Sequence, residues 1–383
     1  MPWLPVAVLV PLSILLGDTI ARLSPFYRKL TERKLTENKS PGRQEGLDAL
    51  RGILALSVLF HHGAWSYGYH QSGEWGLQSS AFYALLGPFA VALFFAITGY
   101  LFWSRMVANR LGDLRAFWWG RLWRIGPLYL LAAAVVVVLV CIKSGGTLRV
   151  TPLILGRELL KLASLGIVTP MQLNGIDIIP LNAGVIWTLR YEWQFYLVVP
   201  VLAWFTLPRR FLLFAAAIAL ASRRNAELLY YLPFLAGMAA VYLVRHPRLA
   251  WLYSWKGSAL TFAGILVFLM GMPVKGYRGT LCLLIVFLPI VAGADLWGIL
   301  RLRGLRVLGT ISYSIYLLHG IVLAACTAAL LRLAPHSWEN PWIWWLAVGV
   351  CTVITVAVSS AAYRWVEHPF LRKPLPSWLI RPQ

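Results

Sequence analysis

Long apolar segments, separated by short polar and basic ones, follow one another along almost the whole chain. A helix needs about 20 apolar residues to cross the ~30 Å hydrocarbon core of a bilayer, and most of these segments approach that length. The pattern therefore predicts an all-α, polytopic transmembrane helical bundle. The expected spans are 3–20, 48–66, 82–103, 122–142, 187–206, 209–221, 228–244, 258–273, 280–297, 307–331 and 342–365.

The first span is separated from the other ten by a basic linker at 21–47. It lacks a basic residue before its apolar run and an A-x-A-like end, which favours an uncleaved extra helix over a signal peptide. The expected division is residues 1–45 for this helix and linker, 46–373 for a membrane domain of ten core helices, and 374–383 for a short cytoplasmic tail. The span at 209–221 is short for a full crossing.

Composition supports a membrane protein. The chain has 383 residues, of which 59% are apolar and 13% are charged, about half the ~25% charged residues of globular proteins. The net charge of +21 does not indicate nucleic-acid binding, because the basic residues lie between the spans. Placing the linker in the cytoplasm puts most Lys and Arg on the inner side, so the N-terminus is expected outside and the C-terminus inside. No cysteine spacing indicates a metal site.

The longest outer connection, 143–186, contains the segment LILGRELLKLASLGIV. Its apolar pattern is interrupted by Arg157, Glu158 and Lys161. This pattern fits an interfacial or re-entrant helix that covers an outward cavity, and it fits a simple surface helix equally well.

Ionisable residues inside spans are costly and mark functional sites. Arg51 and His62 lie eleven residues apart, which places both on one face of a helix and separates them by ~16 Å along its axis. His61 points away from that face and is a weaker candidate, and Asp48 lies where it can pair with Arg51. Core packing is the alternative role for either histidine.

Arg121 and Arg124 share a helical face at the cytoplasmic boundary, at the depth expected for Arg51. They are either ordinary positive-inside residues or part of a cluster of three guanidinium groups, which bind phosphate well. Glu192 lies at about the depth of His62 and needs a partner, for which His62 and Arg190 are candidates.

Two further polar segments come late in the chain. Tyr313, Tyr316 and His319 follow one helix in ISYSIYLLHG, where polar packing and catalysis are both open. Glu367 and Arg364 in YRWVEHPFLRK are expected to cap the last helix and pair locally.

Six segments together resemble the acyltransferase 3 family of integral-membrane O-acyltransferases, which are mostly bacterial. They occur in the family's order from about Gly46 to Arg372: GLDALRGILALSVLFHHG, LFFAITGYLFWSRM, RLWRIGPLYLL, WTLRYEWQFYLVVP, SYSIYLLHG and YRWVEHPFLRK. The family's R/K-x10-H pattern falls on Arg51 and His62, and its RxxR pattern on Arg121 and Arg124. The acidic residue of its W-S-L-x-x-E segment falls on Glu192, although Thr188 replaces the usual Ser.

The resemblance implies transfer of an acyl group, most often acetyl, from cytoplasmic acyl-CoA. The acceptor is a hydroxyl of a sugar, polysaccharide, glycolipid or related molecule on the outer side of the bacterial inner membrane. In the mechanism that we expect, Arg51, Arg121 and Arg124 bind the acyl-CoA phosphates and His62 is the general base or is itself acylated. Glu192 orients or stabilises the imidazole. No extracytoplasmic hydrolase-like domain follows, so acceptor chemistry is expected in the membrane domain or with a partner protein.

Two other function classes remain open from the sequence. A transporter or flippase of a glycan-related substrate uses intramembrane Arg, His and Glu as a pathway, but the chain lacks the related halves that many transporters show. A non-catalytic scaffold of a polymer-assembly complex is the third class.

Overall fold

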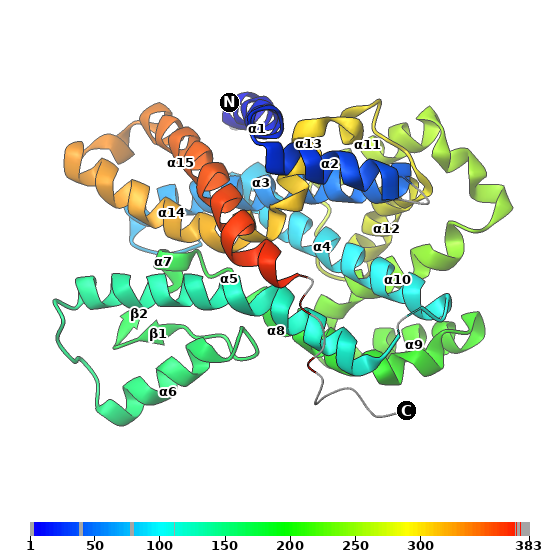
Figure 1. Cartoon of the computed structure of the whole chain (residues 1–383), viewed down its shortest axis with the longest axis horizontal. Helices are drawn as coiled ribbons and strands as arrows, with labels where there is room; N and C mark the ends of the chain where they lie inside the picture. Colours follow the sequence, from blue (N-terminus) through cyan, green and yellow to red (C-terminus); the bar gives the residue numbers. More distant parts are fainter. Residues whose placement is uncertain are drawn as a thin grey trace. The chain divides into compact units, whose positions relative to one another are not determined.

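The computed structural model describes residues 4–37, 41–76, 80–110, 112–371, 373 and 376. Within these residues the chain is helical almost throughout (Figure 1), which confirms the all-α bundle. Of the predicted tail at 374–383, only Pro376 lies within the described residues. The chain forms two compact units, each assembled from three separate stretches of sequence.

The first unit contains residues 1–61, 78–110 and 201–312. Its helices are α1 (Leu4–Leu23), α2 (Pro25–Glu37), the first part of α3 (Pro41–Ser72), α4 (Ala81–Val107), α9 (Pro208–Ala221), α10 (Leu232–Leu243), α11 (Trp255–Leu269), α12 (Tyr277–Ala292) and α13 (Arg303–Thr310).

The second unit contains residues 62–77, 111–200 and 313–383. Its elements are the end of α3, α5 (Leu114–Lys143), α6 (Pro152–Ala163), β1 (Gln172–Leu173), β2 (Ile176–Asp177), α7 (Ile179–Asn182), α8 (Trp187–Leu202), α14 (Ser312–Leu333), α15 (Pro341–Ala362) and the single π-helical turn η6 (Tyr363–Glu367).

Each of the eleven segments predicted to span the membrane contains helix, although the segments predicted at 258–273 and 280–297 are helical only to Leu269 and Ala292. Six stretches in the described part of the chain are long and apolar enough for a crossing, or seven if the bent pair formed by Pro247–Tyr253 and α11 is one span. The segment at 209–221, the doubtful one, forms the 14-residue helix α9. The number of crossings therefore stays a prediction for the shorter helices.

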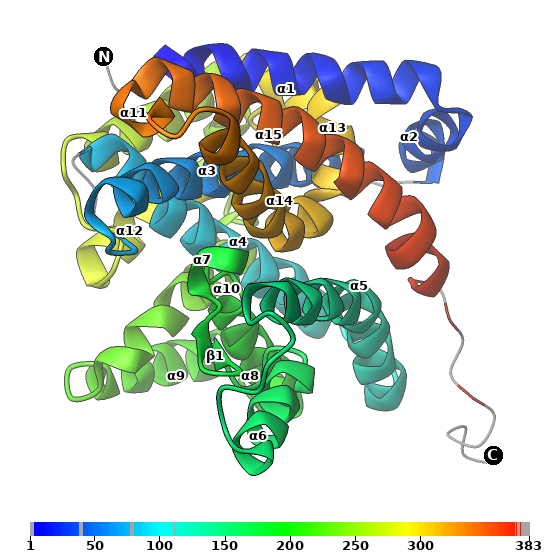
Figure 2. The same ribbon diagram turned by 90° about the vertical axis from the view of Figure 1, so that its left-hand side faces the viewer.

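Small residues let helices approach closely in the first unit. A Cβ atom on Gly237 of α10 would collide with the carbonyl oxygen of Ala96 on α4, and one on Gly304 of α13 would collide with that of Ile14 on α1. Figures 1 and 2 both show α1 next to α13. Close backbone approach at small residues is how apolar helices associate where lipid offers no hydrophobic gain. The extra first helix is thus packed into its unit.

The long connection at 143–186 in the second unit forms the expected helix, α6, and also a hairpin that the sequence did not predict. Thr151 caps α6 by accepting a hydrogen bond from the amide of Ile154. Strands β1 and β2 are joined at Asn174 and Gly175, both with positive φ, as a tight two-residue hairpin requires. Glu158 accepts a hydrogen bond from the amide of Asn174 at 2.7 Å, so the hairpin is fixed to α6 (Figure 2).

Candidate active site

One face of α14 carries polar side chains at three-residue intervals. Tyr313, Tyr316 and His319 therefore follow one another at nearly one-turn intervals, each about 60° round the helix from the previous one. The hydroxyl of Tyr313 donates to the carbonyl oxygen of Ile125 on α5 at 2.9 Å. That of Tyr316 donates to the carbonyl oxygen of Val185, just before α8, at 3.1 Å. The polar face of α14 thus connects the other elements of the second unit.

At the far end of this face His319 meets His62 of α3. The Nε2 atom of His319 lies 2.9 Å from the Nδ1 atom of His62, and both side chains are buried, with 0% and 9% exposure. The other ring nitrogen of His319 lies 3.0 Å from the carbonyl oxygen of Ile315. The next residue on α3 is also fixed, because Trp344 of α15 donates its indole N–H to the carbonyl oxygen of Gly63 at 3.0 Å. His62 is therefore held from two helices.

Two indole rings lie next to the imidazole of His62. Trp75 lies parallel to the imidazole with 6.4 Å between ring centres, and Trp65 meets it edge to face at 5.9 Å. Both indoles are half-buried. The flat apolar faces of these indoles are suited to contact the face of a ring-shaped ligand. They are less suited to a polar ligand that stays fully hydrated.

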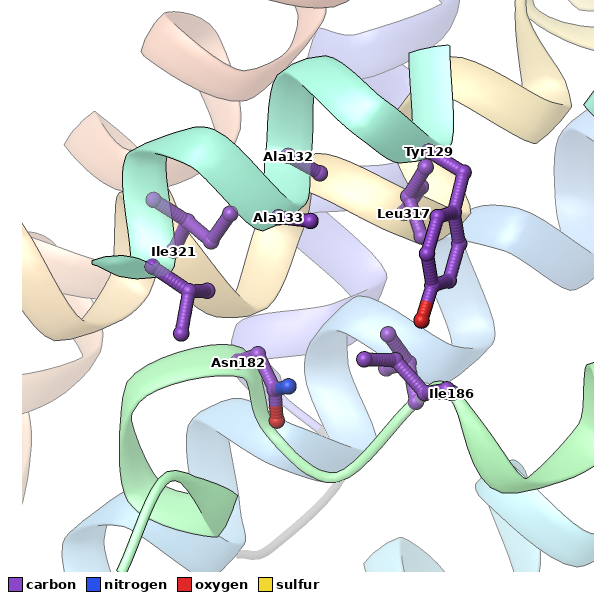
Figure 3. Close-up of a pocket in the computed structure, with 9 residues that line it drawn as sticks. Tyr129, Ala132, Ala133, Asn182, Ile186, Leu317 and Ile321 are labelled. Carbon is purple, nitrogen blue, oxygen red and sulfur yellow. The ribbon is translucent and has the colours of Figure 1, made fainter. Parts of the chain in front are cut away.

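A small pocket lies within the same unit (Figure 3). Its walls are apolar side chains of α5 and α14, together with the segment between α7 and α8. The lining residues are Tyr129, Ala132, Ala133, Val136, Asn182, Val185, Ile186, Leu317 and Ile321.

The close approach of α7 to α14 at this pocket depends on Gly320, because a Cβ there would collide with the backbone of Asn182. Gly320 directly follows His319 in the chain.

Comparison with known proteins identifies the family. Residues 44–364 match the family described as "Acyltransferase domain". The chain belongs to this acyltransferase family. It is also 26% identical over 371 residues to Nodulation protein 10 of Rhizobium leguminosarum bv. viciae, covering 87% of this chain and 95% of that protein. No solved structure matches the chain significantly.

The RxxR arginines of this acyltransferase have separate surroundings. The guanidinium group of Arg124 forms an ion pair with Glu367 of η6, whose second carboxylate oxygen accepts a hydrogen bond from Ser314 at 2.8 Å. The prediction that Glu367 pairs locally with Arg364 is therefore wrong: its side chain is 1% exposed and anchors α5 to α14. A buried carboxylate needs such a cation, since neutral neighbours would leave its charge uncompensated.

Arg121 and Glu192 meet through a common neighbour. The guanidinium carbon of Arg121 lies 5.9 Å from the ring centre of Tyr196, and the Tyr196 hydroxyl donates to Glu192 at 3.4 Å. The described hydrogen-bond partner of His62 is His319, so a contact between Glu192 and His62 stays a prediction. The alternative partner, Arg190, is exposed.

The first unit contains the remaining candidates. Arg51 lies 3.4 Å from Asp48, which confirms the predicted pair, and one unbroken helix, α3, carries both Arg51 and His62. His61 lies 2.7 Å from the carbonyl oxygen of Tyr83 and is buried, which fits the packing role given as its alternative. The cluster of Arg51 with the two RxxR arginines remains a prediction.

The sequence left the roles of His319 and Tyr316 undecided. In the structure His319 contacts His62, and Tyr316 contacts Thr188. The Tyr316 and Thr188 hydroxyls lie 2.8 Å apart. The available signal was the three-residue spacing in SYSIYLLHG. Among the described residues, no group of three His, Cys, Asp or Glu side chains is arranged to hold a metal ion.

Proposed function

We propose that the protein is an integral-membrane O-acyltransferase that moves an acyl group, most simply acetyl, from cytoplasmic acyl-CoA to a hydroxyl of a sugar, polysaccharide or glycolipid. The carrying observation is the buried His62, held by His319 and enclosed by two indoles, in a chain of the acyltransferase family. Transfer to a hydroxyl needs a group that removes its proton near neutral pH, which is the usual task of imidazole.

The chemistry that we propose balances at His62. The acceptor hydroxyl gives its proton to the imidazole while its oxygen attacks the thioester carbonyl carbon. The C–S bond then breaks, and the departing thiolate takes the proton from the imidazolium. A route in which His62 is acylated first needs the same residue and the same two substrates.

The aromatic rings beside His62 support a carbohydrate as the acceptor. Trp75 is stacked on the imidazole with 6.4 Å between ring centres, and Trp65 meets it edge to face at 5.9 Å. The neighbouring Gln71 and Glu74 are exposed. Flat apolar surfaces bordered by hydrogen-bonding groups match a sugar ring, which has apolar faces and a polar edge.

The arginines support acyl-CoA as the donor. Arg121 is half-buried against Tyr196, and Arg124 retains 29% exposure despite its ion pair. We propose that these groups, with Arg51, bind the donor's phosphates through charge-assisted hydrogen bonds. Glu192, fixed by Tyr196, would complete the site by orienting groups around the imidazole.

The proposed orientation follows from the basic segments. With the linker at 21–47 in the cytoplasm, the N-terminus lies outside and the C-terminus inside, and the membrane is the bacterial inner membrane. The acceptor then reaches His62 from the outer side, directly or through a separate extracytoplasmic protein.

The test uses purified protein in lipid nanodiscs with radiolabelled acetyl-CoA and a panel of oligosaccharides. The wild type should label a saccharide, and His62→Ala should lower the turnover by about 10²–10⁴-fold while keeping its melting temperature. His61→Asn is the matched control, because an Asn amide can still donate to the Tyr83 carbonyl. Equal turnover in His62→Ala would refute the assignment. In sealed proteoliposomes, saccharide movement across the bilayer without acyl-CoA would favour the transporter instead.

A further inference from the structure

The two ring nitrogens of His319 have different partners, and this difference determines where its proton lies. Nδ1 lies 3.0 Å from the carbonyl oxygen of Ile315. A carbonyl oxygen only accepts hydrogen bonds, so Nδ1 of His319 must carry hydrogen. In the neutral ring, Nε2 then has a lone pair and is an acceptor.

The neutral form is favoured by burial. The side chain of His319 is 0% exposed, and an ionised group without water is costly. Its two ring nitrogens face a carbonyl oxygen and a second imidazole. Neutral His319 therefore accepts through Nε2.

This arrangement fixes the second imidazole. His62 presents Nδ1 to the accepting Nε2 of His319 at 2.9 Å, so His62 must be the donor and its Nδ1 carries hydrogen. In neutral His62 the lone pair is then on Nε2, the nitrogen farther from α14. Each imidazole has two neutral tautomers. The two successive hydrogen bonds, from His319 to the Ile315 carbonyl and from His62 to His319, select one of these tautomers for His62.

We propose that His319 is a positioning residue that holds His62 in the tautomer with its basic lone pair on Nε2. This inference rests on the proposed function. The acceptor's proton goes to Nε2 of His62, its oxygen bonds to the thioester carbonyl carbon, and the C–S bond breaks with the thiolate removing that proton. The hydrogen on Nδ1 stays in place throughout. Its bond to His319 strengthens when His62 is positive, because charged donors form stronger hydrogen bonds.

The role resembles that of a carboxylate beside a catalytic histidine, with one difference. A carboxylate both orients the ring and supplies a negative charge, whereas His319 orients the ring without a charge. An amide oxygen at the same place should therefore replace it. Gln is long enough to put its oxygen near the position of Nε2, and Asn is too short.

The experiment compares His319→Gln, His319→Asn and His319→Leu in nanodiscs. Acetyl-CoA is the probe, and the released CoA thiol is measured. Leu and Asn should lower kcat by about 10²-fold or more without changing KM for acetyl-CoA, and Gln should restore most of it. If His319 only packs, the kcat of the three variants should instead fall in step with their melting temperatures. If the Leu variant does not fold, the contrast between Gln and Asn still decides.

Solid-state NMR with ring-¹⁵N histidine tests the tautomer itself, with His62→Ala used to assign the signal. The inference expects hydrogen on Nδ1 of neutral His62 in the wild type and a mixture of tautomers in His319→Leu. Hydrogen on Nε2 in the wild type, or unchanged kcat in a folded His319→Leu, would overturn it. If wild-type protein releases no thiol from acyl-CoA, the proposed function fails, whereas the NMR result still supports or refutes the tautomer.

Discussion

Replacing Glu367 with Gln should lower the free energy of unfolding of this protein by about 2–3 kcal/mol. Glu367 is 1% exposed and its carboxylate has two described partners, the guanidinium group of Arg124 and the hydroxyl of Ser314. The substitution keeps the size of the side chain and removes its charge. Arg124 then keeps its own charge without the anion that compensates it.

The magnitude follows from how deeply each partner is buried. Breaking a fully buried ion pair by removing one member costs about 3–5 kcal/mol. Arg124 is 29% exposed, so water still solvates part of the guanidinium. Its contact with the ring of Tyr313, 5.4 Å away, also survives and contributes ~0.5–1 kcal/mol. Gln can still accept from Ser314. These three compensations bring the estimate below the fully buried range.

The measurement is equilibrium unfolding in mixed micelles with increasing SDS, followed by far-ultraviolet circular dichroism. Glu367→Gln, Arg124→Gln and the double variant form a cycle whose coupling energy isolates the pair. Arg121→Gln is the matched control, since Arg121 lies one helical turn earlier and faces Tyr196. It should leave stability within about 0.5 kcal/mol and raise KM for acetyl-CoA.

Wild-type stability in Glu367→Gln, together with a coupling energy near zero, would show that the ion pair does not anchor η6. Arg124→Gln separates the two roles assigned to this arginine. A change in KM for acetyl-CoA with unchanged unfolding would leave donor binding as its function. Loss of stability with normal KM would remove Arg124 from the donor site.

Two further substitutions test other parts of the second unit. Trp75→Ala should raise KM for a saccharide acceptor by about 3–10-fold, because one stacking face worth ~0.5–1.5 kcal/mol is lost, while KM for acetyl-CoA stays constant in the same assay. Gly320→Ala should lower the free energy of unfolding by about 1–3 kcal/mol, since the new methyl group collides with the backbone of Asn182. SDS unfolding measures this loss, and wild-type stability there would contradict the close approach.

Sequence periodicity predicted the helices well and their partners poorly. Apolar segments of spanning length can be recognised from the local sequence, and each of the eleven predicted segments contains helix. The hairpin at β1 and β2 was missed, although Asn174-Gly175 is a strong local turn signal. The two strands are short, and the apolar pattern of the connection that contains them predicts a helix.

Contacts in the candidate site could be predicted from the sequence where both residues of a pair lie on one helix. The pair of Asp48 and Arg51 follows from three-residue spacing alone. The contact of His62 with His319 joins positions 257 apart in sequence, and that of Arg124 with Glu367 joins positions 243 apart. No local sequence pattern predicts contacts between residues so far apart in the chain. The resemblance to a family names the polar residues but leaves their partners open.

The three-residue spacing on α14 gives the second unit its geometry. Tyr313, Tyr316 and His319 each bind a different segment: the backbone of α5, the backbone before α8, and the imidazole on α3. Because one rigid helix fixes all three, a shift of α14 would move His62's partner and the start of α8 together. Sites supported by a single regular element hold their geometry better than sites built on loops. The positioning of His62 therefore depends on α14 as a whole as much as on His319.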